Sequence, residues 1–161
     1  MTTRIVVLAD THMPRRAKEL PTEVLSALQR ADMVIHLGDF TETALLEVLQ
    51  SFAPVFGVHG NNDSEEIRTL FPATRRLDIE GHTLALIHGD LGGRTALAAA
   101  RAVTGADVVL FGHSHRPWCS REDGRLLFNP GSPTDRRWSP HRSFGLLVFA
   151  EEIEPLLVPL P

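Results

Sequence analysis

The sequence contains only one cysteine, Cys119, among its 161 residues. A single thiol cannot form an internal disulfide or a thiolate zinc cluster, and it gives no indication of an oxidising compartment. The chain also lacks an excess of positive charge, because 16 Lys and Arg stand against 20 Asp and Glu, for a formal net charge of −4 at pH 7. General binding to nucleic acid or anionic lipid needs a cationic surface, so a small-molecule ligand is favoured.

Long apolar runs are missing as well. No stretch approaches the ~20 residues of a membrane span, and the apolar part of MTTRIVVLAD is too short for a signal peptide. The chain has no repeat, low-complexity segment or linker, and its 43% of hydrophobic residues can build one sizeable core. We therefore expect a single domain over 1–161, located in the cytoplasm and without membrane association.

The first half of the chain alternates between two kinds of apolar pattern. The segments RIVVLAD, DMVIHLGD and APVFGVHGNND are typical of buried strands, whereas PTEVLSALQRA and ETALLEVLQSF have the spacing of helices. This alternation predicts a parallel sheet with right-handed crossovers. In such a sheet the functional loops lie at the carboxyl ends of the strands.

The second half has more strands and more turns. The expected elements are two strands in RRLDIEGHTLALIHGD, a helix in TALAAARAV, a strand in DVVLFGHSH, a hairpin around residues 122–125, and closing strands in RSFGLLVFAEEIEPLLV. The proline-rich tail EPLLVPLP is expected to end the last strand at a sheet edge. Two mixed sheets with helices outside them are therefore predicted.

Side chains of metal-ligand type follow the predicted buried strands. They are Asp10, His12, Asp39, Asn61, His88, His113 and His115. Any one aspartate at a strand end is usually a turn former or helix cap, and a lone histidine in an apolar strand is usually structural, which is our interpretation of His36. Seven such coincidences are hard to explain separately, so a shared site is predicted.

The chemistry of these side chains restricts the ion. Imidazole, carboxylate and amide oxygen suit Mn²⁺, Fe, Co²⁺, Ni²⁺ or Zn²⁺, and the absence of thiolates argues against a closed structural zinc site. Seven ligands exceed what one ion needs, whereas with one bridging carboxylate they satisfy two. Among the other histidines, His59 is a candidate for lining the site, while His82 and His141 are interpreted as surface turn residues.

Five short motifs resemble those of a known family. In order they are DTH at 10–12, GD at 38–39, GNND at 60–63, HGD at 88–90 and GHSH at 112–115, and together they resemble the series of the calcineurin-like metallophosphoesterases. With NPGS at 129–132 and its small size, the chain is similar to the compact bacterial and archaeal phosphodiesterases, the branch that includes the retromer subunit Vps29. The resemblance implies an α/β fold, a four-layer α/β/β/α sandwich of two mixed β-sheets flanked by helices.

The resemblance also implies roles for the site residues. One ion would be held by Asp10, His12 and His115, the other by Asn61, His88 and His113, with Asp39 bridging them. The implied ions are two divalent transition metals, Mn²⁺ first and Fe, Zn²⁺, Ni²⁺ or Co²⁺ as alternatives. The implied reaction is hydrolysis of a phosphate ester by in-line attack of a metal-bridging hydroxide.

The residues after Asn61 depart from the larger phosphatases, which carry a histidine where this chain has Asn62. The candidate catalytic residues are therefore Asp39, Asn62 and Asp63. Asp63 is expected to hydrogen-bond to a metal ligand. The sequence leaves open which group acts as the acid that the histidine provides in the larger phosphatases. In the HGD motif, Asp90 stands where the family often has histidine and is a candidate for orienting an imidazole. Candidate substrate contacts are Arg136, Arg137 and Arg142, for which a solvated basic loop is the alternative.

Three functions are consistent with these motifs. A phosphodiesterase acting on a small-molecule phosphate ester is favoured, with a phosphomonoesterase as an alternative. A noncatalytic, Vps29-like interaction scaffold is the second alternative, although such a scaffold could have lost ligands that are all present here. Trp138 and the tail PLLVPLP are candidates for a contact in a homo-oligomer.

Overall fold

A computed structural model describes all residues, 1–161, as ten strands and four helices. The strands are β1 (Thr3–Leu8), β2 (Met33–His36), β3 (Val55–Gly57), β4 (Thr74–Ile79), β5 (His82–Ile87), β6 (Val108–Leu110), β7 (Trp118–Glu122), β8 (Arg125–Asn129), β9 (Ser143–Phe149) and β10 (Ile153–Pro159). The helices are α1 (Thr22–Leu28), α2 (Thr43–Gln50), α3 (Glu65–Leu70) and α4 (Ala96–Ala102). None of the helices has the length and hydrophobicity that crossing a membrane requires.

The strands form two five-stranded mixed sheets. The first has the order β10-β9-β1-β2-β3, in which β1, β2 and β3 are parallel, and β9 and β10 are antiparallel additions at one edge. The second has the order β4-β5-β6-β8-β7, with parallel β5, β6 and β8 between antiparallel edge strands. The predicted βα alternation and both predicted hairpins are confirmed.

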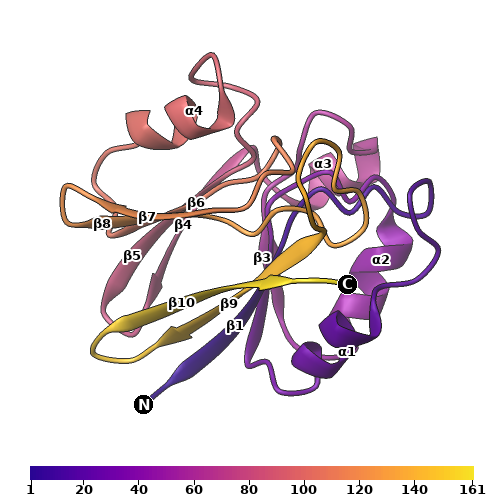
Figure 1. Cartoon of the computed structure of the whole chain (residues 1–161), viewed down its shortest axis with the longest axis horizontal. Helices are drawn as coiled ribbons and strands as arrows, with labels where there is room; N and C mark the ends of the chain where they lie inside the picture. Colours follow the sequence, from indigo (N-terminus) through magenta and orange to yellow (C-terminus); the bar gives the residue numbers. More distant parts are fainter.

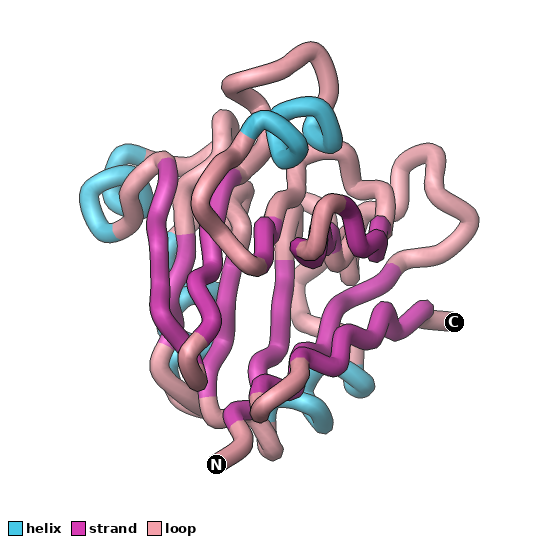
Figure 2. The backbone as a smooth tube through the Cα atoms, turned by 90° about the vertical axis from the view of Figure 1, so that its left-hand side faces the viewer, coloured by secondary structure: helices cyan, strands magenta, loops and turns pink.

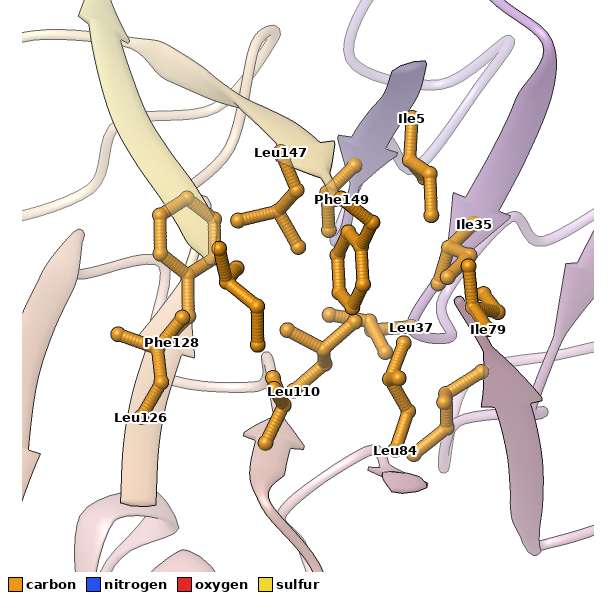
Figure 3. Close-up of a cluster of buried hydrophobic side chains, with 14 of the residues drawn as sticks. Ile5, Ile35, Leu37, Ile79, Leu84, Leu110, Leu126, Phe128, Leu147 and Phe149 are labelled. Carbon is orange, nitrogen blue, oxygen red and sulfur yellow. The ribbon is translucent and has the colours of Figure 1, made fainter. Parts of the chain in front are cut away.

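The main core lies between the two sheets, and strand alternation supplies it. In β1, Ile5 and Val7 point into the inter-sheet core, whereas Val6 and Leu8 belong to the cluster on the opposite face, as the two-residue period of a strand requires. Figure 3 shows Leu147 and Phe149 of the first sheet opposite Leu110 and other side chains of the second.

Helices cover both outer faces. Side chains of α1, α2 and α3 pack with Val6, Leu8 and Val34 on the first sheet. On the second sheet, Ala96 and Ala100 of α4 pack against Val109 and the strands beside it. Figure 1 shows α4 outside one sheet and α1 and α2 outside the other. The α/β/β/α sandwich is thus confirmed.

One detail differs from the predictions. The helix α3 was not predicted, because its six residues are too few to show an apolar period; it begins after Ser64, whose hydroxyl accepts from the Ile67 amide at 3.3 Å. The proline-rich tail ends the last strand at a sheet edge, as predicted. It forms β10, pairing with β9 through Pro159, and this is possible because β10 is an edge strand.

Long loops gather at one end of the sandwich. Figure 2 shows the N-terminus at the lower end of the molecule and long loops at the upper end. The parallel strands β1, β2 and β3 all run in the direction of β1, away from the N-terminus. The loops at their carboxyl ends carry four of the seven predicted ligands, Asp10, His12, Asp39 and Asn61.

Candidate metal centre

Both sheets contribute to one cluster of polar side chains. Asp10 and His12 follow β1, Asp39 follows β2 and Asn61 follows β3. From the second sheet, His88 follows β5, and His113 and His115 follow β6. The structure brings all seven predicted ligands together at the carboxyl ends of these strands, joined through the contacts described below.

Backbone hydrogen bonds hold the ligand loops to one another. The amide of Asp10 donates to the carbonyl of Gly38 at 3.0 Å, and that of His12 donates to the carbonyl of Asp39 at 2.9 Å. In the second sheet, the Gly112 amide donates to the carbonyl of His88 at 2.9 Å. Each loop is therefore fixed by its neighbour before any ligand binds.

Five of the seven residues have a left-handed backbone. Their φ angles are +56° for Asp10, +45° for His12, +61° for Asp39, +72° for His113 and +58° for His115. Side-chain-bearing residues adopt this conformation infrequently, at a cost on the order of 1 kcal/mol each, and it is concentrated at functional sites. The fold thus maintains an unfavourable backbone in order to turn these side chains toward one another.

Two glycines allow the loops to approach closely. A Cβ on Gly38, which has φ +99°, would lie 2.6 Å from Nδ1 of His88. A Cβ on Gly60 would collide with Oδ1 of Asp39. The glycines of the GD and GNND motifs therefore provide the space in which a histidine and an aspartate of the cluster lie.

Asp10, His12 and His115 form the first of two groups with ligand geometry. Their donor atoms converge: Nε2 of His12 lies 3.2 Å from Nε2 of His115, which lies 3.9 Å from Oδ1 of Asp10. All three side chains are buried. This is the set that the family resemblance assigns to one ion.

Asp10, Asp39 and His88 form the second group. Nε2 of His88 lies 3.4 Å from Oδ2 of Asp39, 3.1 Å from Oδ1 of Asn61 and 3.3 Å from Nδ1 of His113. The same oxygen of Asp39 lies 3.5 Å from Nε2 of His12. Asp39 thus reaches both groups, as a bridging carboxylate must.

Two imidazoles are oriented by backbone carbonyls. Nδ1 of His88 lies 2.7 Å from the carbonyl oxygen of Leu37, and Nδ1 of His115 lies 2.6 Å from that of Asp135. A carbonyl oxygen only accepts, so Nδ1 carries the proton in each ring and Nε2 faces the cluster. A hydrogen bond of this kind is the usual support of a metal-binding histidine.

The carboxylate of Asp10 provides a test of whether the site suits a cation. Asp10 is completely buried, and neither of its oxygens has a hydrogen-bond partner in the chain. Burial raises the pKa of this carboxyl to about 7, although the charge of His88 and the nearby backbone N–H of His113 act in the opposite direction. An unsatisfied buried carboxylate is unfavourable unless a cation pairs with it, so these residues fit divalent metal ions.

The other ligands are electrostatically coupled. Burial acts to raise the pKa of Asp39, but hydrogen bonds and charge from His88, together with hydrogen bonds from Asn62, bring it below its usual range. Burial acts to lower the pKa of His88, yet Asp39 and Asp10 raise it to about 9. Burial lowers the pKa of His115 to about 4, which favours the neutral ring that binds metal.

Asn62 and Asp63 both form hydrogen bonds with Asp39. The carboxylate of Asp63 accepts backbone N–H groups from Asp39 at 2.9 Å, from Gly60 at 2.6 Å and from Thr41 at 2.8 Å. It therefore ties the GD loop to the GNND loop through the backbone of the ligand and not through its side chain. Asn62 is exposed, and it donates to the Asp39 carboxylate.

The NPGS segment supports the GHSH loop. Asn129 donates from Nδ2 to the carbonyl of Gly112 at 3.2 Å and to the hydroxyl of Ser114 at 3.1 Å. The Ser132 hydroxyl donates to the carbonyl of Asp10 at 2.8 Å. Ser114 itself is exposed. Asn129 is therefore a support for the loop that carries His113 and His115.

The other histidines lie outside the cluster. His36 is fully buried, stacks on Phe40 with 3.6 Å between ring centroids, and lies 3.0 Å through Nε2 from the Thr11 hydroxyl. The Gly38 amide donates to Nδ1 of His36 at 3.2 Å, so both ring nitrogens have a partner, in agreement with the structural interpretation of this residue. His82 is not the surface turn residue that was predicted: it is the first residue of β5, is half-buried, and contacts the carbonyl of Ala150 at 3.2 Å. Nδ1 of His59 lies 3.3 Å from the carbonyl oxygen of Gly60. His141 is exposed.

A polar cleft of about 640 Å³ adjoins the cluster. It is lined by His12, Pro14, Arg15, Arg16, Lys18, Thr41, Glu42, Asn62 and Arg137. Of the three arginines suggested from sequence, only Arg137 lines it, because Arg136 donates to the Ser139 carbonyl and Arg142 to that of Pro161. The cationic residues after the DTH motif were missed, since their proximity to Arg137 depends on the tertiary fold.

Comparisons with known proteins agree with this geometry. The model of the calcineurin-like phosphoesterase superfamily domain matches residues 3–152. A probable metallophosphoesterase of Methanothermobacter thermautotrophicus is 35% identical over 158 residues, which are 96% of this chain and 91% of that protein. Phosphodiesterase YfcE of Escherichia coli is 29% identical over 163 residues, covering 89% of this chain and 86% of its own.

Among solved structures, vacuolar protein sorting 29 of Cryptosporidium parvum has the same fold. Its TM-score with this chain is 0.80 at 20% sequence identity, and the alignment covers 99% of this chain and 98% of that one. At this identity the likeness concerns the arrangement of sheets and helices alone. The donor set at the strand ends has to be judged from the residues of this chain.

Proposed function

Because the chain belongs to the calcineurin-like phosphoesterase superfamily, we propose that it hydrolyses phosphate diesters with the help of two divalent transition-metal ions. The observation that carries the proposal is Asp10, whose buried carboxylate has no hydrogen-bond partner by normal geometry and belongs to both groups of donors. Asp10, His12 and His115 would hold one ion, Asn61, His88 and His113 the other, and Asp39 both. Two such ions would supply Lewis-acid stabilisation of a phosphoryl group and a water of lowered pKa.

The chain's own residues prepare the site in three ways. Leu37 and Asp135 orient His88 and His115 through their carbonyls. Asn62 holds the Asp39 carboxylate, so that one of its oxygens faces His12 and His88. The exposed position of Asn62 and the adjoining cleft leave room for a substrate beside the cluster.

The preference for a diester is supported by the relative named as a phosphodiesterase, YfcE. Mn²⁺ is the proposed ion, since carboxylate, amide and imidazole together suit it and no thiolate favours zinc. A complete set of seven donors supports catalysis over a role as a binding scaffold. A scaffold would not need a buried carboxylate without a partner.

The test is hydrolysis by protein freed of metal and then reloaded. Bis(4-nitrophenyl) phosphate and 4-nitrophenyl phosphate would be compared at equal concentration with Mn²⁺, Zn²⁺, Ni²⁺ or Co²⁺, and bound metal would be counted by elemental analysis. We expect about two ions per chain and faster turnover of the diester. Preference for the monoester would overturn the substrate assignment, and full activity of metal-free protein would overturn the mechanism.

A further inference from the structure

We propose that the cationic cleft beside the metal centre binds a second anionic group of the substrate, so that the natural substrate is a phosphate ester with a further phosphate and no large apolar part. The cleft is the one lined by Arg15, Arg16, Lys18 and Arg137. The identification of the substrate rests on the proposed function, whereas the binding of a second phosphate can be measured without turnover.

The cleft is continuous with the metal centre. Two of its lining residues are His12, a candidate ligand, and Asn62, which donates to Asp39. Its volume of about 640 Å³ is within the range of small-molecule sites and exceeds what one phosphate fills. A substrate with its scissile phosphate at the metals would therefore extend into this space.

The charge of the cleft is opposite to that of the molecule. Four cationic side chains and one carboxylate, Glu42, line it, whereas the chain as a whole has a formal net charge of −4. Two divalent ions against the carboxylates of Asp10 and Asp39 leave about two positive charges at the centre, and about one when the bridging water has lost its proton, which already matches the single charge of a diester. The additional cations are unnecessary for the scissile group and are suited to another anion.

Part of the cleft is held in place relative to the metal centre. Asp135 lies between two of the arginines, with Oδ2 at 3.3 Å from Nε of Arg16 and 3.8 Å from Nε of Arg137. The carbonyl of the same residue orients His115. Arg15 and Lys18 make no ion pair with any carboxylate of the chain, so their charges are available to a ligand.

The lining excludes an apolar occupant. Pro14 is the only nonpolar residue of the cleft, and its lining contains no Phe, Tyr or Trp; its one ring is the imidazole of His12, a candidate ligand. Apolar surface near the centre lies elsewhere, in a separate pocket that contains Phe111, Trp118 and Trp138. A phosphorylated polyol or sugar fits the cleft better than an ester with a large apolar group.

The test compares two probes that differ by one phosphate, 1,3-propanediol bisphosphate and propyl phosphate. Each is titrated calorimetrically into Mn²⁺-loaded protein at 0.15 M salt, with bound metal counted before and after. We expect the bisphosphate to bind about tenfold more tightly, as two exposed cations would produce. In Arg15→Gln/Lys18→Gln the ratio of the two dissociation constants should fall to about two.

The matched control is Arg4→Gln/Arg30→Gln, which removes the same charge from exposed residues outside the cleft, at the amino end of β1 and after α1. In this control the ratio of the two dissociation constants should equal that of the native protein. Equal affinity of the two probes for native protein would overturn the proposal. Equal loss in both double variants would also overturn it, because long-range attraction of anions would then be sufficient.

Hydrolysis of bis(4-nitrophenyl) phosphate, measured on the same samples, separates the two proposals. If the protein discriminates between the probes but hydrolyses neither diester nor monoester, the anion site stands and the proposed function fails. If the protein hydrolyses the diester but binds the two probes with equal affinity, the anion site fails and the proposed function stands. Circular dichroism of each variant establishes that it is folded.

Discussion

Asn62 donates to both oxygens of the Asp39 carboxylate, from its backbone nitrogen at 2.9 Å and from its side-chain Nδ2 at 3.1 Å. An amide in this position orients the carboxylate, but it has no proton to release as an acid near neutral pH. General-acid help, worth about 10² to 10⁴ in rate, is therefore absent from this position.

We expect hydrolysis to depend steeply on the leaving group. Without a proton donor the departing oxygen leaves as an anion, so diesters with acidic phenols should react far faster than alkyl diesters. Asn62→His should reduce the slope by supplying a proton. The measurement is a series of diesters that differ only in leaving-group pKa, with metal saturating and chemistry rate-limiting.

Asn62→Ala provides the control for this comparison, because it removes the bond to Asp39 without adding an acid. It should lower the rate for all diesters and keep the slope. Little dependence on leaving-group pKa in the native protein would mean that another residue donates the proton, and the interpretation of Asn62 would be wrong.

Asp39→Asn should be among the most damaging single changes. It removes the one carboxylate that lies within 3.5 Å of a histidine in each group, and with it the negative charge between the two ions. We expect turnover to fall by roughly 100-fold or more, with loss of bound metal by elemental analysis. Asp123→Asn is a suitable control, because this exposed turn residue has a left-handed φ of +54° that asparagine also adopts. Near-native turnover of Asp39→Asn would contradict the two-ion arrangement.

Metal should stabilise the fold as well as support turnover. A cation relieves the buried, unpartnered carboxylate of Asp10, and binding to the folded state alone adds about 2.7 kcal/mol when the free ion is at 100 times its dissociation constant. The unfolding midpoint should therefore rise on addition of Mn²⁺ and fall with a chelator. His82→Gln should keep both the shift and the metal content, whereas Asp10→Asn should lose them. An unchanged midpoint in native protein would count against a metal site.

His36 should make the fold sensitive to acid. Burial lowers the pKa of this ring to about 3, compared with an ordinary value of 6.5. The unfolded chain therefore binds a proton that the folded chain does not between these pH values, and stability decreases as pH falls through this interval, by up to about 1.4 kcal/mol per pH unit. Urea unfolding with chelator present, at pH 4 to 7, should show a shallower acid loss in His36→Gln. The metal content of His36→Gln should match that of the native protein. If the free energy of unfolding depends on pH identically in the two proteins, His36 is not the source of the acid sensitivity.

Much of the fold could be predicted because each buried strand is a short apolar run bounded by polar or turn residues. DMVIHLGD and DVVLFGHSH are examples, and both became central strands. A six-residue helix such as α3 shows too little of its period to be recognised. The edge position of β10 could be predicted, because a proline such as Pro155 is acceptable in a strand only where one side has no partner.

The candidate ligands could be predicted because polar residues at the ends of buried strands must meet when the strands share an edge. Their roles remain predictions, as does the extent of the single domain. The cationic cleft could not be predicted in the same way. Arg15 and Lys18 follow the DTH motif, whereas Arg137 comes from a loop near the end of the chain, and no pattern in the sequence links the two segments.

The division of the donors between two sheets has a consequence for the order in which the protein matures. During synthesis Asp10, His12 and Asp39 leave the ribosome early, but His88, His113 and His115 belong to the second half of the chain. No fragment that ends before His115 contains all seven donors, and none that ends before Asp135 contains the carbonyl that orients His115. Ion capture would thus follow docking of the two sheets, and a chain cut between them would have to reassemble before it could retain metal.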